Sequence, residues 1–217
     1  MTEIIQTISL ALLPVTLAIT LHEAAHGYAA RYFGDPTAHL AGRITLNPIR
    51  HIDPIGTIAV PLLILLVSGG GMLFGWAKPV PVDFGRLRKP KRDMTWVAGA
   101  GPAANLLMAV FWAAMLKLAW AMPENAYTMP LALMSQIGIS INVVLMVLNL
   151  LPLPPLDGGR IAVSLLPHEM AWRFAKLERW GFPILLVLLF TGVLGAVLFP
   201  LVRLVRMAIA GLFGFPG

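Results

Sequence analysis

The chain has 217 residues, of which 58% are hydrophobic and only 12% are charged. A soluble domain usually carries about 25% charged residues, so this composition excludes an ordinary water-soluble protein and indicates an all-α protein that crosses a membrane several times. The net charge of +6 does not indicate nucleic acid, because the basic residues lie in loops between apolar segments, where they suit cytoplasmic loops and anionic lipid headgroups. The sequence has no cysteine, so any zinc site must use histidine and carboxylate ligands.

The first predicted element is a long apolar helix from about Ile4 to Phe33, which contains the motif His22-Glu23-Ala24-Ala25-His26. Residues four apart lie on one face of a helix, so His22 and His26 can present nitrogen atoms to one metal ion. Glu23 is rotated by about 100° from His22, close enough to act on a metal-bound water without being a ligand. Zinc suits this pair, because it accepts imidazole and carboxylate ligands and keeps a position open for water in catalytic sites.

The apolar surroundings distinguish this motif from one that arises by chance. On a soluble helix the same pattern can lie on a solvated face, but from Ile4 to Ala30 the only charged group apart from the two histidines is Glu23. An acidic group at the centre of a membrane helix costs ~2.5–3.5 kcal/mol, a cost that a bound metal offsets. Arg31 marks the end of the helix as cytoplasmic, which places the histidines nearer to that side of the membrane.

A short β element is predicted after the first helix. His39–Pro48 shows partial alternation of apolar and polar residues, which predicts a strand with an open edge where an extended peptide can dock. An ordinary surface hairpin fits the pattern equally well. His51 follows in a stretch dense in turn-forming residues, where a loop role is more common than a role as a third metal ligand.

The apolar segment Ile55–Phe74 has basic residues on both sides, three arginines before it and six Lys or Arg residues between Gly71 and Met94. A simple span would place one of these basic flanks outside, against the positive-inside rule. We therefore expect a re-entrant path that turns near Gly69-Gly70-Gly71 and returns through Trp76–Val82 as an extended strand covered by protein.

Two further spans are predicted at Thr95–Met122 and Leu131–Leu151. The first begins with a run of small residues, Ala98–Asn105, which lets helices approach closely. Asn105 at its end can bind the substrate backbone or form a hydrogen bond between helices. The second span carries a polar stripe at a spacing of seven residues, which faces the bundle interior: Ser135, Asn142 and Asn149.

Asp157 follows the second of these spans, in the sequence Pro152-Leu153-Pro154-Pro155-Leu156-Asp157-Gly158-Gly159. The prolines forbid a regular helix and the glycines permit close backbone approach, so Asp157 is held on a rigid, unwound segment at the cytoplasmic end. It is the best candidate for a third zinc ligand, because catalytic zinc usually has three protein ligands. A role as the cap of a helix that begins near Gly159 stays open.

The C-terminal part contains a basic amphipathic stretch, Arg160–Trp180, suited to the cytoplasmic surface, and a last span at Gly181–Val202. Arg203 and Arg206 mark an interfacial end after that span. We expect five or six membrane segments in a single domain, residues 1–217, with its core at residues 4–160 and its surface and membrane helices at 161–217.

The pairing of HEAAH on one membrane helix with NLLPLPPLDGG on a later one resembles the site-2 protease family of intramembrane zinc metalloproteases. The segments GPAAN, TLNPIRHIDPIGT and FGWAKPVPV are similar to those of the compact bacterial group that lacks a PDZ domain. The resemblance implies that zinc is held by His22, His26 and Asp157 and that Glu23 is the catalytic acid and base. It also implies a substrate-binding or oxyanion role for Asn149, and a loop beside the site that docks unwound substrate.

The expected function is hydrolysis of peptide bonds within or near transmembrane segments of membrane proteins. Membrane lipids and transmembrane substrates are the expected partners, in a bacterial inner membrane and with the active site toward the cytoplasm. A prenyl-protein-processing peptidase would need a later glutamate ligand, whereas the later glutamates lie in loop or surface positions: Glu124, Glu169 and Glu178. A metal transporter would line a path through the membrane with ionisable groups, whereas here such groups gather at one depth.

Overall fold

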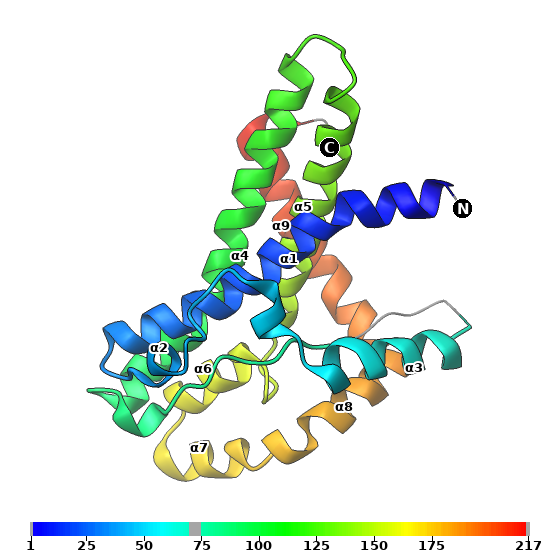
Figure 1. The fold of residues 1–217 in the computed structure, drawn as a ribbon. Helices are drawn as coiled ribbons and strands as arrows, with labels where there is room; N and C mark the ends of the chain where they lie inside the picture. Colours follow the sequence, from blue (N-terminus) through cyan, green and yellow to red (C-terminus); the bar gives the residue numbers. More distant parts are fainter. Residues whose placement is uncertain (1, 70–74, 216–217) are drawn as a thin grey trace.

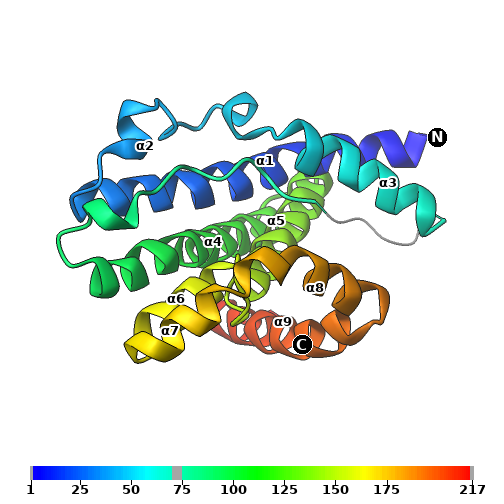
Figure 2. The same ribbon diagram turned by 90° about the horizontal axis from the view of Figure 1, so that it is seen from below.

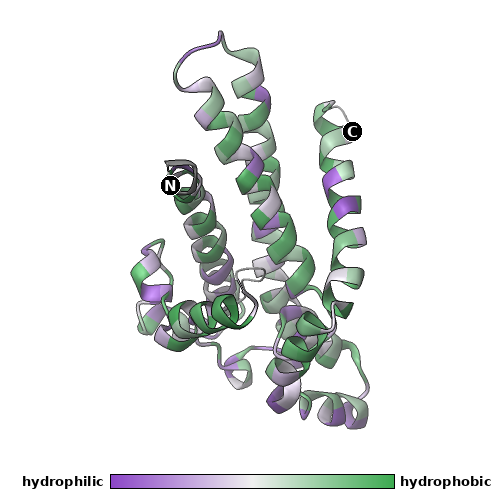
Figure 3. Ribbon diagram, turned by 90° about the vertical axis from the view of Figure 1, so that its right-hand side faces the viewer, coloured by the Kyte–Doolittle hydropathy of each residue, from purple (hydrophilic) through white to green (hydrophobic). Residues whose placement is uncertain are grey.

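The computed structural model describes residues 2–69 and 75–215, and no β-strand occurs among them. Four helices are long and apolar enough to cross a membrane: α1 (Thr2–Tyr32), α4 (Pro90–Ala121), α5 (Thr128–Asn149) and α9 (Val193–Phe213). Figure 1 shows α4 and α5 as a long hairpin that α1 crosses, and hydrophobic residues cover most of these helices (Figure 3). The prediction of an all-α membrane protein with several spans is confirmed.

The centre of the bundle lies between α4 and α5, with α9 packed against them. Its buried residues include small ones, such as Ala109 and Ala113, which let the helix backbones approach. The same principle operates where Trp112 of α4 lies over Gly138 of α5, because a Cβ atom at Gly138 would come within 2.3 Å of the indole ring. This tight interface fixes α5, the helix that leads into the segment containing Asp157.

The β element predicted at His39–Pro48 is wrong. The chain instead forms the short helix α2 (Thr37–Leu40) and, after a bent stretch, the 3-10 helix η1 (Pro48–His51). Within the predicted strand, amides form local hydrogen bonds in place of ladder bonds: the Arg43 amide donates to the Ala38 carbonyl at 3.0 Å, and the Asn47 amide donates to the Thr45 hydroxyl at 3.1 Å. Such bonds favour turns and helix starts over sheets.

The segment between α2 and α4 folds back on itself. The π-helix η2 (Pro54–Ala59) and α3 (Val60–Val67) form one apolar stretch about 20 Å long, shorter than the ~30 Å hydrocarbon core. In the predicted turn at Gly69-Gly70-Gly71, Gly69 has a positive φ of 61° and the other two glycines lie outside the described residues. Beyond them the Trp76 amide donates to the Gly56 carbonyl at 3.0 Å. The chain thus turns back toward the start of this stretch, which is what the predicted re-entrant path requires. Residues 75–83 then run beside α1 without helical turns or strand pairing (Figure 2).

Three shorter helices follow α5: α6 (Asp157–Leu165), α7 (His168–Ala175) and α8 (Glu178–Phe190). The single span predicted at Gly181–Val202 is wrong, because the chain breaks at Gly192, whose φ of 77° ends α8. The last long helix is therefore α9, and Arg203 and Arg206 lie within it and not beyond its end.

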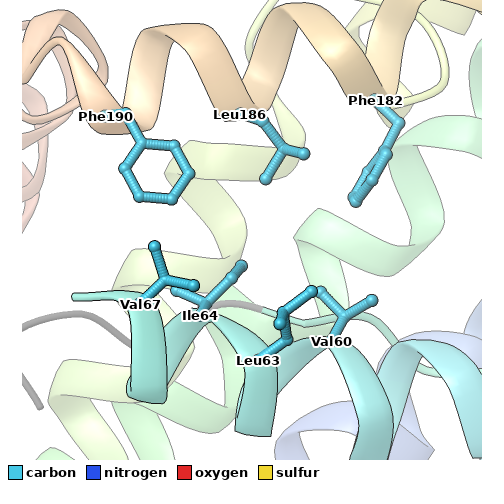
Figure 4. A pocket seen from close by; sticks show the side chains of 7 residues that line it. All are labelled: Val60, Leu63, Ile64, Val67, Phe182, Leu186 and Phe190. Atoms are coloured by element: carbon cyan, nitrogen blue, oxygen red, sulfur yellow. The ribbon is translucent and has the colours of Figure 1, made fainter. Parts of the chain in front are cut away.

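We call η2 and α3 together (residues 54–67) the arm. The arm and α8 face each other across an apolar cavity of about 300 Å³ (Figure 4). Its lining comes from α3 and α8 and consists of Val60, Leu63, Ile64, Val67, Phe182, Leu186 and Phe190. Next to it, the Trp76 and Phe182 rings meet edge to face with 4.6 Å between their centroids. The contact between the chain beyond the arm and α8 is thus made by two aromatic rings.

Candidate metal centre

The two motif histidines lie on the buried face of α1. His22 and His26 are only 7% and 8% exposed, and their Nε2 atoms are 3.1 Å apart. This convergence follows directly from the four-residue spacing on a helix.

Asp157, the first residue of α6, meets both rings. Its Oδ2 atom lies 3.3 Å from Nε2 of His22 and 3.3 Å from Nε2 of His26. The ligand atoms of the three residues all lie within 4.8 Å of one another, and the carboxylate is almost completely buried. The structure therefore brings together the three residues predicted as ligands, and the carboxylate lies against the imidazoles.

Glycines allow the proline-rich segment to hold Asp157 in this place. A Cβ atom at Gly158 would come within 2.2 Å of the Leu150 carbonyl oxygen, and one at Gly159 within 2.3 Å of the Pro154 nitrogen. Helix α8 packs on the same segment through Gly181, where a Cβ atom would lie 1.9 Å from the Pro154 carbonyl oxygen. Since these neighbours are backbone atoms, larger residues would displace the segment and Asp157 with it.

The outer nitrogen of each imidazole has its own partner. Nδ1 of His22 lies 2.6 Å from Oδ1 of Asn105, and Nδ1 of His26 lies 2.8 Å from the carbonyl oxygen of Val97. Both partners are acceptors, so the hydrogen of each ring is on Nδ1 and the Nε2 lone pair is directed to the shared centre. Two such lone pairs beside a buried carboxylate repel one another unless a cation lies among them, and this donor set fits Zn²⁺.

Gly101 of α4 permits this close arrangement. A Cβ atom there would come within 2.4 Å of Nε2 of His26 and within 2.6 Å of Cε1 of His22. The run of small residues predicts close helix packing, but it does not indicate which glycine lies against the imidazoles.

Asn105 lies behind His22, completely buried. Its Nδ2 donates to the Ala18 carbonyl at 3.1 Å and to Oδ1 of Asn142 at 3.0 Å. Of the two roles open from the sequence, these bonds fit the one between helices. The predicted substrate-binding role does not fit, because the Asn105 amide has no exposed surface to offer.

Glu23 is half-buried on the next edge of α1, where its Oε2 accepts a hydrogen bond of 2.7 Å from the Val80 amide. Val80 stands between Pro79 and Pro81. Since proline has no amide hydrogen, Val80 supplies the one backbone donor of these three residues. Sequence reasoning missed this contact, although the alternating prolines could have indicated it.

Two other residues considered from the sequence lie apart from the cluster. Asn149 is half-buried at the end of α5, and its Nδ2 donates to the Leu145 carbonyl at 3.0 Å. In the part of the chain that the structure describes, no hydrogen bond joins it to the three clustered residues. His51 is buried and its Nε2 donates to the Thr45 carbonyl at 3.0 Å, as expected for a loop residue.

Comparison with known proteins agrees with the sequence motifs. Residues 117–192 match the model of the family described as peptidase family M50. The chain is 42% identical over 206 residues to "Putative zinc metalloprotease YwhC" of Bacillus subtilis, a match that covers 93% of this chain and 90% of that protein. It is 33% identical over 186 residues to "Putative zinc metalloprotease Rip2" of Mycolicibacterium smegmatis, covering 86% of this chain and 68% of that protein.

No solved structure matches the chain. The identity to YwhC extends over nearly the whole of both proteins, and the fold has helices able to cross a membrane. The predicted family is therefore confirmed: this chain belongs to peptidase family M50, the site-2 protease family, and is a metalloprotease of the membrane.

Proposed function

We propose that the protein is a zinc peptidase that hydrolyses peptide bonds within or near the transmembrane segments of membrane proteins. His22, His26 and Asp157 hold the zinc, and Glu23 is the acid and base. The observation that carries the proposal is the convergence of three buried ligand atoms within 4.8 Å, with the outer nitrogen of each imidazole already bonded.

A bound zinc ion supplies a Lewis acid, which lowers the pKa of a water molecule toward about 7 and polarises the substrate carbonyl. Glu23 accepts the proton of the attacking water and returns it to the leaving amine. The Val80 amide engages Oε2 of Glu23, so that the carboxylate keeps one orientation while Oε1 stays available for the water.

Residues 75–83 are the segment that we assign to substrate docking, because the strand edge predicted at His39–Leu46 does not form. The segment is fixed by neighbours on either side: the Lys78 amide donates to the His51 carbonyl at 2.8 Å, and the Arg43 guanidinium donates to the Lys78 carbonyl at 2.9 Å. A substrate helix must unwind before its carbonyl can be attacked. The amides of Trp76, Lys78 and Val80 already have partners, so the segment receives the unwound substrate through its other backbone groups and its side chains.

We further propose a bacterial inner membrane location with the active site toward the cytoplasm. The end of α1 near the site carries Arg31, and the neighbouring connection to α4 is rich in Lys and Arg. The loop between α4 and α5, residues 122–127, contains neither. By the positive-inside rule, the end of α1 that carries Arg31 is cytoplasmic.

The direct test is cleavage of a model transmembrane peptide by the purified, zinc-loaded protein. Glu23→Gln should retain zinc and lose about 10²–10⁴-fold in rate, because general acid and base catalysis is removed while the ligands remain. Full activity in Glu23→Gln would contradict the assigned role. Uptake of zinc into vesicles without peptide cleavage would favour a metal transporter instead.

A further inference from the structure

A second buried asparagine lies one layer behind the candidate metal centre. Asn142 of α5 is completely buried, and its Nδ2 donates to the Gly138 carbonyl at 2.9 Å. That bond identifies which end of the Asn142 amide is oxygen, and the oxygen accepts from Nδ2 of Asn105 at 3.0 Å. Asn142 contacts none of the three proposed ligands through these bonds, so the zinc proposal gives it no role.

The orientation of the Asn105 amide depends on two contacts, one of which is this one. Nδ2 of Asn105 has two hydrogens, and they go to the Ala18 carbonyl and to Oδ1 of Asn142. Both of these atoms can only accept. The amide oxygen of Asn105 must therefore face His22, where it lies 2.6 Å from Nδ1.

The tautomer of His22 follows from the orientation of that amide. With the Asn105 oxygen opposite Nδ1, the imidazole hydrogen resides on Nδ1 and the lone pair is on Nε2. If the amide were reversed, its NH₂ group would face Nδ1 and the hydrogen would move to Nε2, which could not then bind a metal. His26 has no such dependence, because its Nδ1 faces the backbone carbonyl of Val97, which cannot reverse.

We infer that Asn142 is a positioning residue for the metal centre, which together with the Ala18 carbonyl holds the Asn105 amide and thereby favours the metal-binding tautomer of His22. The series of hydrogen bonds runs from α5 through α4 to α1, three helices that meet at this level (Figure 1). The inference rests on the proposed zinc function, and it makes zinc affinity depend on a residue with no bond to a ligand.

The test measures zinc affinity of the purified protein by competition with a chelator. Asn142→Leu removes the acceptor for Asn105 in a side chain of similar size and should weaken zinc binding about 10-fold, the lower end of the range for outer-shell changes. Asn142→Asp keeps an oxygen in the same place and should stay within about 3-fold of the unmodified protein, because the carboxyl group can accept from Asn105 in either protonation state.

Ser135→Ala is the matched control. Ser135 is a completely buried polar residue of the same helix, but its hydroxyl donates to the Leu131 carbonyl at 2.7 Å, within α5. Its replacement should leave zinc affinity unchanged, and so should separate the effect of the asparagine pair from a general loosening of α5. Cobalt substituted for zinc gives a second readout, since its visible absorption should change in Asn142→Leu and persist in Asn142→Asp and Ser135→Ala.

Cleavage of a transmembrane peptide distinguishes this inference from the proposed function. Asn142→Leu should lose activity when zinc is limiting and regain it in excess zinc, because the ligands and Glu23 are intact. Equal zinc affinity in Asn142→Leu and the unmodified protein would overturn the inference alone, whereas an unmodified protein that binds no zinc would overturn both. If Asn142→Leu does not fold, Asn142→Ala removes the same acceptor and is judged by the same results.

Discussion

The metal centre and the arm formed by η2 and α3 show two different ways of holding chain segments together. At the metal centre, buried polar groups are joined by defined hydrogen bonds, and glycines bring backbones and rings into contact at distances that leave no room for a methyl group. Between the arm and α8 there is an apolar cavity of about 300 Å³, and many side chains of α3 are more than half exposed.

The difference matches the demands on each region. Catalytic groups must be held within a fraction of an ångström of their working geometry, which dense packing and hydrogen bonds provide. An apolar surface that meets lipid has no such requirement, and apolar contacts that lack direction can be rearranged at low cost. The two regions meet at residues 75–83, which begin beside Phe182 at Trp76 and reach Glu23 at Val80.

The largest effect should come from overfilling the metal centre. Gly101→Ala places a methyl group 2.4 Å from Nε2 of His26, so we expect zinc affinity to fall by more than about 100-fold, beyond the range of outer-shell changes. Bound zinc per protein, measured after dialysis against a weak chelator, checks this. Gly99→Ala is the matched control on the same helix, because nothing lies within 4 Å of its added Cβ atom.

The junction at Val80 should give the next largest effect. Val80→Pro removes the amide that bonds Glu23, so cleavage of a transmembrane peptide should fall about 10- to 100-fold, part of the contribution of general acid and base catalysis. Zinc content should be unchanged. Val80→Ala keeps the amide and shortens the side chain, and if it were as inactive as Val80→Pro, the amide would not be the important group.

A smaller effect is expected on the free energy of unfolding, which should fall more for a change in the core than for one in the arm. Leu116 is 5% exposed in the α4–α5 core, so Leu116→Ala should reduce the free energy of unfolding by about 2–5 kcal/mol. Leu63 of the arm is 60% exposed, so Leu63→Ala should cost less than about 1 kcal/mol. Reversible unfolding of both variants in detergent micelles makes the comparison, and equal losses would show that the arm is as firmly packed as the core.

The smallest effect should appear in acid, at the joint between α1 and α2. Burial by itself raises the pKa of Asp35. Hydrogen bonds from Thr37 and from the Asp83 amide lower the pKa by more than burial raises it, so the net pKa is below its ordinary value. The stability that this carboxylate contributes is therefore present above its unfolded pKa of about 3.9 and is lost as pH falls through the lowered folded pKa. Asp35→Asn should flatten the acid side of the profile of melting temperature against pH, and an unchanged profile would contradict this.

The sequence predicted those features that depend on local spacing. The grouping of His22 with His26 follows from helix periodicity, and the position of Asp157 follows from prolines and glycines that limit the backbone. The return of the chain to Gly56 was predictable from charge, because basic residues on both flanks of Ile55–Phe74 cannot both be cytoplasmic across a simple span.

Features that depend on distant pairs were not predictable in this way. Val80 and Glu23 are 57 residues apart in sequence, and the role of Asn105 depends on Asn142 in another helix. The predicted strand at His39–Pro48 failed because its Arg43 and Asn47 amides bond to groups nearby in the sequence. The break at Gly192 was missed since one glycine in an apolar run does not reveal whether it adopts a positive φ.

The central claim is that His22, His26 and Asp157 bind a single zinc ion together. X-ray absorption at the zinc edge of the loaded protein tests it most directly, compared with Asp157→Ala. The account predicts one zinc per chain with two imidazole nitrogens and a carboxylate oxygen at about 2.0–2.2 Å, and loss of that oxygen together with most of the bound zinc in Asp157→Ala. Full zinc content and an unchanged absorption spectrum in Asp157→Ala would contradict the account.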